Sequence, residues 1–183
     1  MRAYAEQNPL TLGLVDVRDE CFGGTARQWI DSNGDDQYKI KCSLSVTAYY
    51  GADRKHFVSV LDGILAAGDR PGSGVPFNHS SDGQIIHYYR QHGGQEQEPE
   101  APQLSSASHT LSWDPVRDRN RSYLMVTEPD KCRASDPPVA RCLREPESGT
   151  VAAIRSQYGM VFKLDLGHSD YFTMYKDGRT RRN

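Results

Sequence analysis

The stretch QYKIKCSLSVTAYY, residues 37–50, alternates apolar and polar side chains more regularly than any other part of the chain. Successive side chains of a β-strand point to opposite faces of a sheet, so this alternation predicts a strand with one buried and one solvated face. It places Cys42 on the apolar face, where a buried thiol or a half-cystine fits and a hydrated reactive group does not. The apolar positions are Tyr38, Ile40, Cys42, Leu44 and Val46, and the polar positions are Lys39, Lys41, Ser43, Ser45 and Thr47.

Further strands and one or two helices are expected on either side of this stretch. Segment 10–19 alternates leucines with smaller residues and then runs into two valines, which predicts a strand with one register change. Residues 57–68 have apolar side chains at helical spacing, with Asp53 as a helix cap, and predict a helix. The other expected elements are strands at 84–91, 109–113, 122–128, 159–166 and 170–176, a hairpin turn at 167–170 and a second short helix at 149–158. The chain is therefore predicted to be α+β, an α/β sandwich with a mainly antiparallel sheet and one or two helices packed on one face.

One polar segment divides the sequence. Residues 93–108 are mostly Gly, Gln, Glu, Pro and Ser, which bury little surface, so we expect a linker or a long loop there. It separates an N-terminal half, residues 1–92, from a strand-rich half, residues 109–183. Neither half alone has a generous apolar core, so we expect the second half to complete the same domain.

The overall charge argues against several classes of protein. The net charge is −2 and the pI is near 6.3, so we expect no nucleic-acid partner, which would call for clustered Lys and Arg. The basic run GRTRRN, residues 178–183, is interpreted as a solvated tail.

Apolar runs reach only about four residues, too few to cross or insert into a membrane. The first ten residues lack the apolar core of a signal peptide, so the chain is expected to be either cytosolic or a mature form.

The cysteines favour the extracellular alternative. Four cysteines allow two disulfides, and two glycosylation sequons, at Asn78 and Asn120, are also typical of secreted proteins. A bridge between Cys132 and Cys142 would restrain a polar loop that contains two adjacent prolines, and it leaves Cys21 to pair with Cys42. We therefore expect a secreted protein with disulfides among Cys21, Cys42, Cys132 and Cys142.

A catalytic or metal-binding role for Cys21, the first cysteine of the chain, is disfavoured. Asp19 and Glu20 precede Cys21, and their negative charge would raise the pKa of its thiol, whereas a nucleophile needs a lowered one. The sequence contains neither a Cys-x-x-Cys nor a His-x-x-x-His pattern, so no metal site is expected. The segment GDRPGSG, residues 68–74, lacks the Lys-Ser/Thr of a phosphate-binding loop and is interpreted as a helix stop and turn. We predict no catalytic residue and no cofactor.

Four segments follow one another in a recognisable order: LVDVRDECFGGTARQW at 14–29, KIKCSLSVTAYY at 39–50, KHFVSVLDGILAAGDRPGSGVP at 55–76 and SDGQIIHYYR at 81–90. In this order and spacing they resemble the small secreted fungal killer toxins of the killer-protein-four type. The resemblance covers about residues 13–91. This sequence differs from the cysteine-rich members of the family because it has no cysteine between residues 52 and 91. It implies an α/β sandwich, secretion and inhibition of a target cell's growth, with calcium-channel blockade as the reported activity. It also implies a functional basic residue just ahead of the second cysteine, for which Lys39 and Lys41 are the candidates.

The sequence itself supports a binding role for these lysines and for nearby tyrosines. Lys39 and Lys41 lie on the polar face of their strand, free to meet a partner's carboxylates. Tyrosine supplies a large contact area at low entropic cost, and two tyrosine pairs, 49–50 and 88–89, each have one member expected on the surface. The predicted binding residues are Lys39, Lys41, Tyr49 and Tyr88. The expected partner is a protein or membrane protein of another cell, and the oligomeric state is left open.

Two alternatives are kept beside a secreted toxin or effector. A small secreted hydrolase such as a nuclease would use His87 with His79 or His56, or the acid pair Asp35 and Asp36. A cytosolic immunity or partner-binding protein would keep its cysteines free.

Overall fold

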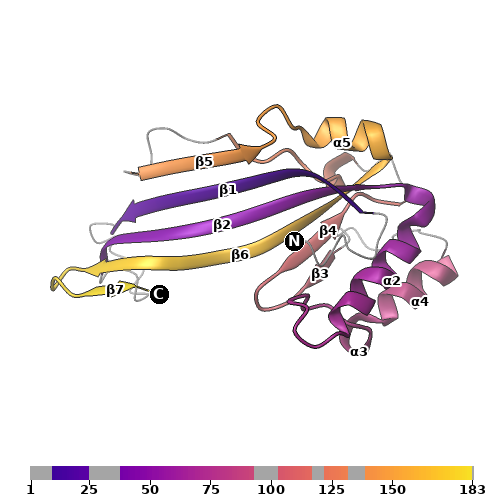
Figure 1. Ribbon diagram of the computed structural model, residues 1–183, viewed down its shortest axis with the longest axis horizontal. Coiled ribbons are helices and arrows are strands. Elements are labelled where there is room, and N and C mark those ends of the chain that lie inside the picture. The colour runs from indigo at the N-terminus through magenta and orange to yellow at the C-terminus, as the bar shows by residue number, and fades with distance from the viewer. Residues whose placement is uncertain (1–9, 25–37, 93–102, 117–121, 132–138, 183) are drawn as a thin grey trace.

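One antiparallel sheet of seven strands forms the centre of the computed structural model, which describes residues 10–24, 38–92, 103–116, 122–131 and 139–182 (Figure 1). The strands are β1 (Thr11–Gly23), β2 (Tyr38–Ala52), β3 (Gln103–Ser105), β4 (Thr110–Trp113), β5 (Val139–Glu145), β6 (Met160–Tyr175) and β7 (Thr180–Arg182). Their order is β3-β4-β6-β2-β1-β5, and β7 pairs with the far end of β6. The helices are α2 (Phe57–Gly68), α3 (His79–Asp82), α4 (Gln84–His92) and α5 (Val151–Tyr158), with 3₁₀ turns at Arg54–His56 and Ser122–Leu124. The α+β class predicted from the sequence is confirmed.

The sheet combines strands from both halves of the sequence. Strand β6 lies between β4 and β2, and β1 lies between β2 and β5. The N-terminal strands β1 and β2 are thus enclosed on both sides by strands from the C-terminal half. Residues 103–105, expected to belong to the linker, form strand β3 instead, because the buried Leu104 pairs with Leu111 of β4. Residues 93–102 lie outside the described residues.

Two hydrophobic clusters cover opposite faces of the sheet at its helical end. The larger cluster packs α2 and α4 on one face, and the aromatic ring of Phe57 contacts the rings of Tyr89, Trp113 and Phe162. The smaller cluster packs α5 on the other face, where Gly51 lets the helix approach. A Cβ atom at residue 51 would lie 2.1 Å from the ring of Tyr158. The predicted helices at 57–68 and 149–158 are confirmed as α2 and α5.

The predicted register change in the first strand is also confirmed. The pairing of β1 with β2 shifts between Leu12 and Leu14, at Gly13. As a result Leu10 joins the larger cluster and Leu14 the smaller one, although residues four apart in a regular strand share one face.

Residues 84–91 form a helix, so the predicted strand was wrong. Ile86 and Tyr89 are the buried residues of α4, and their spacing of three brings both onto one helical face against the core. Isoleucine and tyrosine favour strands intrinsically, but the burial of this face decides the local structure.

The C-terminal hairpin lies further along the chain than predicted. Residues 160–175 form the single strand β6, and Gly167 makes a bulge within it at φ 75°, a conformation that L side chains rarely adopt. The chain turns back at residues 175–179 instead, and residues 180–182 pair with β6 as strand β7. The interpretation of 178–183 as a solvated tail was therefore wrong for residues 180–182.

Two further assignments in the second half differ from prediction. Residues 139–141, expected in the polar loop between Cys132 and Cys142, form β5 together with residues 142–145, which had no predicted element; the whole segment pairs with β1. The predicted strand 122–128 is a 3₁₀ turn followed by irregular chain.

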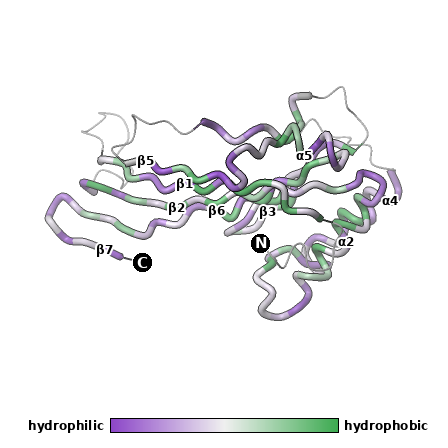
Figure 2. Tube along the Cα trace, turned by 45° about the horizontal axis from the view of Figure 1, so that its top comes forward, coloured by the Kyte–Doolittle hydropathy of each residue, from purple (hydrophilic) through white to green (hydrophobic). Residues whose placement is uncertain are grey.

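Beyond the helices the sheet continues as an extension formed by residues 15–23, 38–47, 139–145 and 167–182, at the left of Figure 1. Hydrophobic and hydrophilic residues alternate along its strands (Figure 2). One face, here called the apolar face, continues the side that α2 and α4 cover; the other, the basic face, continues the side of α5. The apolar face carries Val15, Val17, Ile40, Leu44, Val46, Leu143, Phe172, Met174 and Tyr171. None of the helices in the described ranges is long and apolar enough to cross a membrane.

Candidate binding surface

A row of four side chains crosses the basic face of the extension near its tip. The register pairs Phe22 of β1 with Lys41 of β2, Lys41 with Thr173 of β6, and Thr173 with Arg181 of β7. Directly paired residues in antiparallel strands point to the same side of the sheet, so all four share one face. Lys39 is exposed and lies two residues along β2 from Lys41, at the point where the pairing of β2 with β6 shifts between Tyr38 and Ile40.

An ion pair and a histidine hold Lys41 in place. Its Nζ atom lies 2.8 Å from one carboxylate oxygen of Asp170, and the other oxygen lies 2.9 Å from Nε2 of His168. The hydrogen bond from Lys41 is the main reason that the pKa of Asp170 lies below its usual range. Lys41 is therefore not free to meet a partner's carboxylates, as predicted, but shares its charge with Asp170. In the described part of the chain no ion pair involves Lys39.

Positive charge is concentrated at the tip although the chain as a whole is slightly acidic. Residues 20–23, 38–43 and 170–182 hold six basic side chains and three acidic ones, whereas the net charge of the chain is −2. One of the six, Arg182, lies on the apolar face. One of the three acids, Asp177, pairs with Arg179 in the turn between β6 and β7. The guanidinium of Arg179 also lies over the ring of Tyr175. The tip is thus a basic surface with aromatic side chains among the cations.

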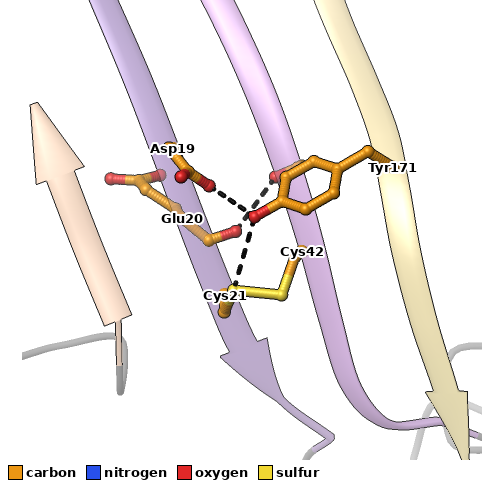
Figure 3. Close-up of a disulfide and its surroundings, with 6 residues drawn as sticks. Asp19, Glu20, Cys21, Cys42 and Tyr171 are labelled. Carbon is orange, nitrogen blue, oxygen red and sulfur yellow. Dashed lines mark hydrogen bonds between the residues drawn. A yellow bond between two sulfur atoms is a disulfide. The ribbon is translucent and has the colours of Figure 1, made fainter.

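The predicted bridge between Cys21 and Cys42 is confirmed (Figure 3), and it lies on the opposite face of the sheet from this row. The two residues are direct partners in neighbouring strands, with Cα atoms 4.0 Å apart. Tyr171 reaches across β2, where its hydroxyl donates to Asp19 at 2.7 Å and lies 3.9 Å from the sulfur of Cys21. This hydrogen bond is the main reason that the pKa of Tyr171 is raised.

The second predicted bridge is described only in part. Cys142 is disulfide-bonded, and its predicted partner Cys132 lies outside the described residues. None of the described cysteines is a free thiol, which does not fit the cytosolic alternative with free cysteines.

A second polar cluster lies on the basic face closer to α5. The carboxylate of Asp16 is almost fully buried between Arg18, at 2.9 Å, and Arg144, at 3.5 Å. A cavity of about 590 Å³ opens beside it, lined among others by Lys131 and Glu145. Because both oxygens of Asp16 already face arginines, the cluster ties β1 to β5 rather than presenting a free carboxylate for chemistry.

Two acids, the buried Asp114 and the exposed Glu128, fix the irregular chain that crosses this face. Asp114 accepts from the backbone N–H groups of Val126 and Val161, each at 2.9 Å, and from the guanidinium of Arg155 at 2.8 and 3.0 Å. Glu128 accepts from the first two backbone N–H groups of α5, so it caps that helix from a distant part of the chain. These contacts explain why residues 126–128 do not pair as a strand.

The tyrosines predicted to bind a partner are mostly unavailable. Tyr49 is 2% exposed because the α5 cluster covers it, and burial raises its pKa to about 12. Its neighbour Tyr50 is equally buried on the opposite face, since both faces of β2 are covered at this end. Tyr88 lies half-buried on α4, where its ring stacks on His92 and meets Tyr89 edge to face. The prediction of an exposed Tyr49 was therefore wrong.

The histidines proposed for a hydrolase do not converge. His79 is held by Asp69, with Nδ1 2.5 Å from its carboxylate, while Asp62 lies 3.6 Å from Nε2. The bond to Asp69 raises the pKa of His79, which favours a charged clamp between α2 and α3 over a general base. His87 is exposed on α4, and His56 pairs with Asp53 at 3.7 Å. Asp35 and Asp36 lie outside the described residues, within which no group of histidine, cysteine or acidic side chains could hold a metal ion.

Of the two sequons, one is described. Asn78 caps α3, because its side chain accepts from the backbone N–H of Ser81 at 3.0 Å. Asn120 lies outside the described residues.

Sequence reasoning missed Phe22, Asp170 and Arg181 as members of the basic surface. A local signal existed only for Arg181, which belongs to the basic run at 178–183. Its position in the row, next to Thr173, follows from the pairing of β7 with β6, which the sequence did not indicate.

No protein-family model matches this chain, and neither a curated protein nor a solved structure is similar to it. The resemblance to killer toxins therefore stays a prediction.

Proposed function

We propose that this protein is a secreted toxin or effector that acts by binding, and that the basic face of its extension docks on a carboxylate-rich protein surface of a target cell. The observation that carries the proposal is the row from Phe22 through Lys41 to Arg181, with the exposed Lys39 beside it.

The composition of this surface favours a protein partner. Arginine and aromatic residues are enriched in the parts of protein interfaces that contribute most binding energy. Phe22 is 41% exposed and offers such an aromatic contact among the cations. An arginine fork matches the geometry of a carboxylate, and the cations would steer an acidic partner toward the tip.

The disulfide between Cys21 and Cys42 supports secretion. The bridge between Cys21 and Cys42 is of a kind that forms and persists in oxidising compartments. Growth inhibition of the target cell, and interference with one of its ion channels, are what the resemblance to killer toxins adds to the proposal. Detection of the protein in the culture medium of its source, and not in washed cell extracts, is the expected result for a secreted protein.

Binding to immobilised poly-L-glutamate, measured by surface plasmon resonance, tests the docking surface. We expect saturable binding that weakens at least tenfold in Lys39→Glu and in Arg181→Glu and that weakens further with added salt. Arg70→Glu is the matched control, because Arg70 is equally exposed at the end of α2, away from the extension. Its affinity should change less than twofold.

Two results would contradict the proposal. One is an equal loss in all three variants, which would reflect net charge and not a defined surface. The other is tighter binding to duplex DNA or to heparin than to poly-L-glutamate, which would point to a phosphate or sulfate partner.

A further inference from the structure

The apolar face of the extension is partly open to solvent although most of its side chains are apolar. Leu44, Tyr171 and Leu143 are exposed by 39%, 38% and 62%. The cluster beneath α2 and α4 includes Ala48 and reaches only as far along β6 as Leu166. Antiparallel sheets that have one apolar face normally bury it against another layer. Contiguous exposed apolar surface on a folded protein marks an interaction site.

We propose that this apolar face packs against the same face of a second copy of the chain, so that two extensions stack as a β-sandwich in a homodimer. The proposal does not rest on the proposed function, because it concerns the opposite side of the extension.

The size of the face reaches the minimum for a specific dimer interface. Eight residues of a strand span about 27 Å, and four strands side by side span about 19 Å, which gives a flat area of about 500 Å². Two copies would then cover about 1,000 Å² together, which is the lower limit for a specific interface. Sheets stacked in this way pack about 10 Å apart with their strands nearly aligned.

The charges on the face favour a second copy over a charged partner. Asp19 and Glu145 lie on it with Arg141 and Arg182, so acids and bases are equal in number. A two-fold interface must be complementary to itself, which a face with both signs satisfies. The opposite face is basic and would repel its own copy, and stacking through the apolar faces keeps the two basic faces on the outside.

The position of the helices fixes the relative direction of the two copies. Helices α2 and α4 rise from the same side of the sheet as the apolar face, at the other end of the strands (Figure 1). Packed helices need about 8–10 Å, which is as much as the whole gap between stacked sheets. The extensions can therefore overlap only when the copies run in opposite directions, each tip pointing toward the helices of the other. Both basic faces then point outward, and one dimer could engage two target sites.

Sedimentation velocity of the full chain over the micromolar range tests the dimer. The wild-type protein should sediment with twice the chain mass of 20.5 kDa and dissociate on dilution. Leu44→Asp and Leu143→Asp should each raise the dimer dissociation constant at least tenfold, because a carboxylate would be buried in the interface. Leu143→Lys is a second variant at the most exposed of these positions, and it should dissociate the dimer in the same way.

The matched control is Phe22→Asp, which places the same charge at a side chain of similar exposure, 41%, on the basic face. It should leave the dimer intact and weaken binding to poly-L-glutamate. Circular dichroism and thermal melts of all variants must match the wild type. Leu143→Asp should bind poly-L-glutamate through each basic face as the wild type does, so failure of the dimer and failure of the proposed function are distinguishable.

A wild-type protein that sediments at 20.5 kDa throughout the range would overturn the proposal. So would variants at Leu44 and Leu143 that remain dimeric, or a control at Phe22 that dissociates equally. A monomer that binds a different protein through this face would overturn it as well.

Discussion

Tyr171 of β6 donates a hydrogen bond of 2.7 Å to Asp19 of β1 across the intervening strand β2. The two residues are 152 positions apart in the chain, and their side chains meet above the disulfide of Cys21 and Cys42 (Figure 3). Tyr171 can reach this far because the register of β6 against β2 shifts at this point, between Cys42 and Ser43. This contact links the three central strands of the extension on the face that we propose to be a dimer interface.

The first prediction concerns the ionisation of Tyr171. The bond to Asp19 is the main cause of its raised pKa, so Asp19→Asn should lower the pKa of Tyr171 toward the ordinary value of 10. Ultraviolet absorbance of tyrosinate, measured against pH, checks this shift, with Tyr171→Phe to identify the signal. A titration unchanged by Asp19→Asn would contradict the hydrogen bond.

The second prediction concerns the cross-strand disulfide. Replacing both Cys21 and Cys42 by serine frees a loop closed over 21 residues in the unfolded chain. We expect a loss of about 3 kcal/mol in the free energy of unfolding, from the entropy of that loop. Urea denaturation measures it, and Ser169→Ala, an exposed change on the same sheet, is the control. A loss below about 1 kcal/mol would mean that the unfolded chain is already restrained there.

The third prediction concerns the buried acid that organises the helical end. Asp114 is fully buried and serves two backbone N–H groups and Arg155. Asp114→Ala should cost about 3–5 kcal/mol of folding stability, because it leaves buried donors and a cation without a partner. Asp177→Ala removes an exposed carboxylate from Arg179 and should leave the folding stability nearly unchanged, because water screens this ion pair. The double change Asp114→Ala with Arg155→Met should cost less than the sum of the two single changes. Additive losses would show that Asp114 and Arg155 do not act together.

The fourth prediction concerns pH. The pKa of His79 is raised above 6.5 by Asp69, so its contribution to stability is complete below about pH 6.5 and is lost as pH rises through the folded-state value. The pKa of Asp69 is lowered below 3.8 by His79, so its contribution is present above about pH 3.8 and is lost as pH falls through the folded-state value. The clamp between α2 and α3 is therefore fully formed between about pH 4 and 6.5.

His79→Gln should flatten the pH dependence of the melting temperature on the alkaline side of this window. Thermal melts across the pH range, with His87→Gln on the exposed face of α4 as the control, measure the effect. Identical pH profiles for the wild type and His79→Gln would show that the contact with Asp69 contributes no stability.

Much of the fold could be predicted where the signal is local. The alternation in residues 37–50 placed Leu44 and Val46 on one face, and the apolar spacing of residues 57–68 gave α2. The change from alternating leucines to valines after Leu14 indicated a register change in β1, which the structure places slightly earlier, between Leu12 and Leu14. The assignment failed for residues 84–91, where strand-forming residues pack as a helix, and for residues 139–145, where a polar segment became a strand. In both cases contacts with distant segments outweighed intrinsic preference.

The candidate surface was predictable only in part for the same reason. Lys39 and Lys41 were identified, but the ion pair of Lys41 with Asp170 depends on a register between strands far apart in the chain. The burial of Tyr49 depends on α5, which covers the face that alternation alone marks as solvated.

The sequence by itself determined the alternation of side chains along the long strands and the apolar side of α2, since backbone geometry sets which neighbouring side chains share a face. It also determined which cysteines are present to form disulfides. Only the tertiary structure decided which of those faces is covered. The sheet order puts α2 and α4 on one side and α5 on the other, and it carries the strands beyond all three helices. Burial is a property of segments brought together across the whole chain, and for that reason one strand, β2, holds both the most deeply buried tyrosines and the most exposed lysine of the proposed surface.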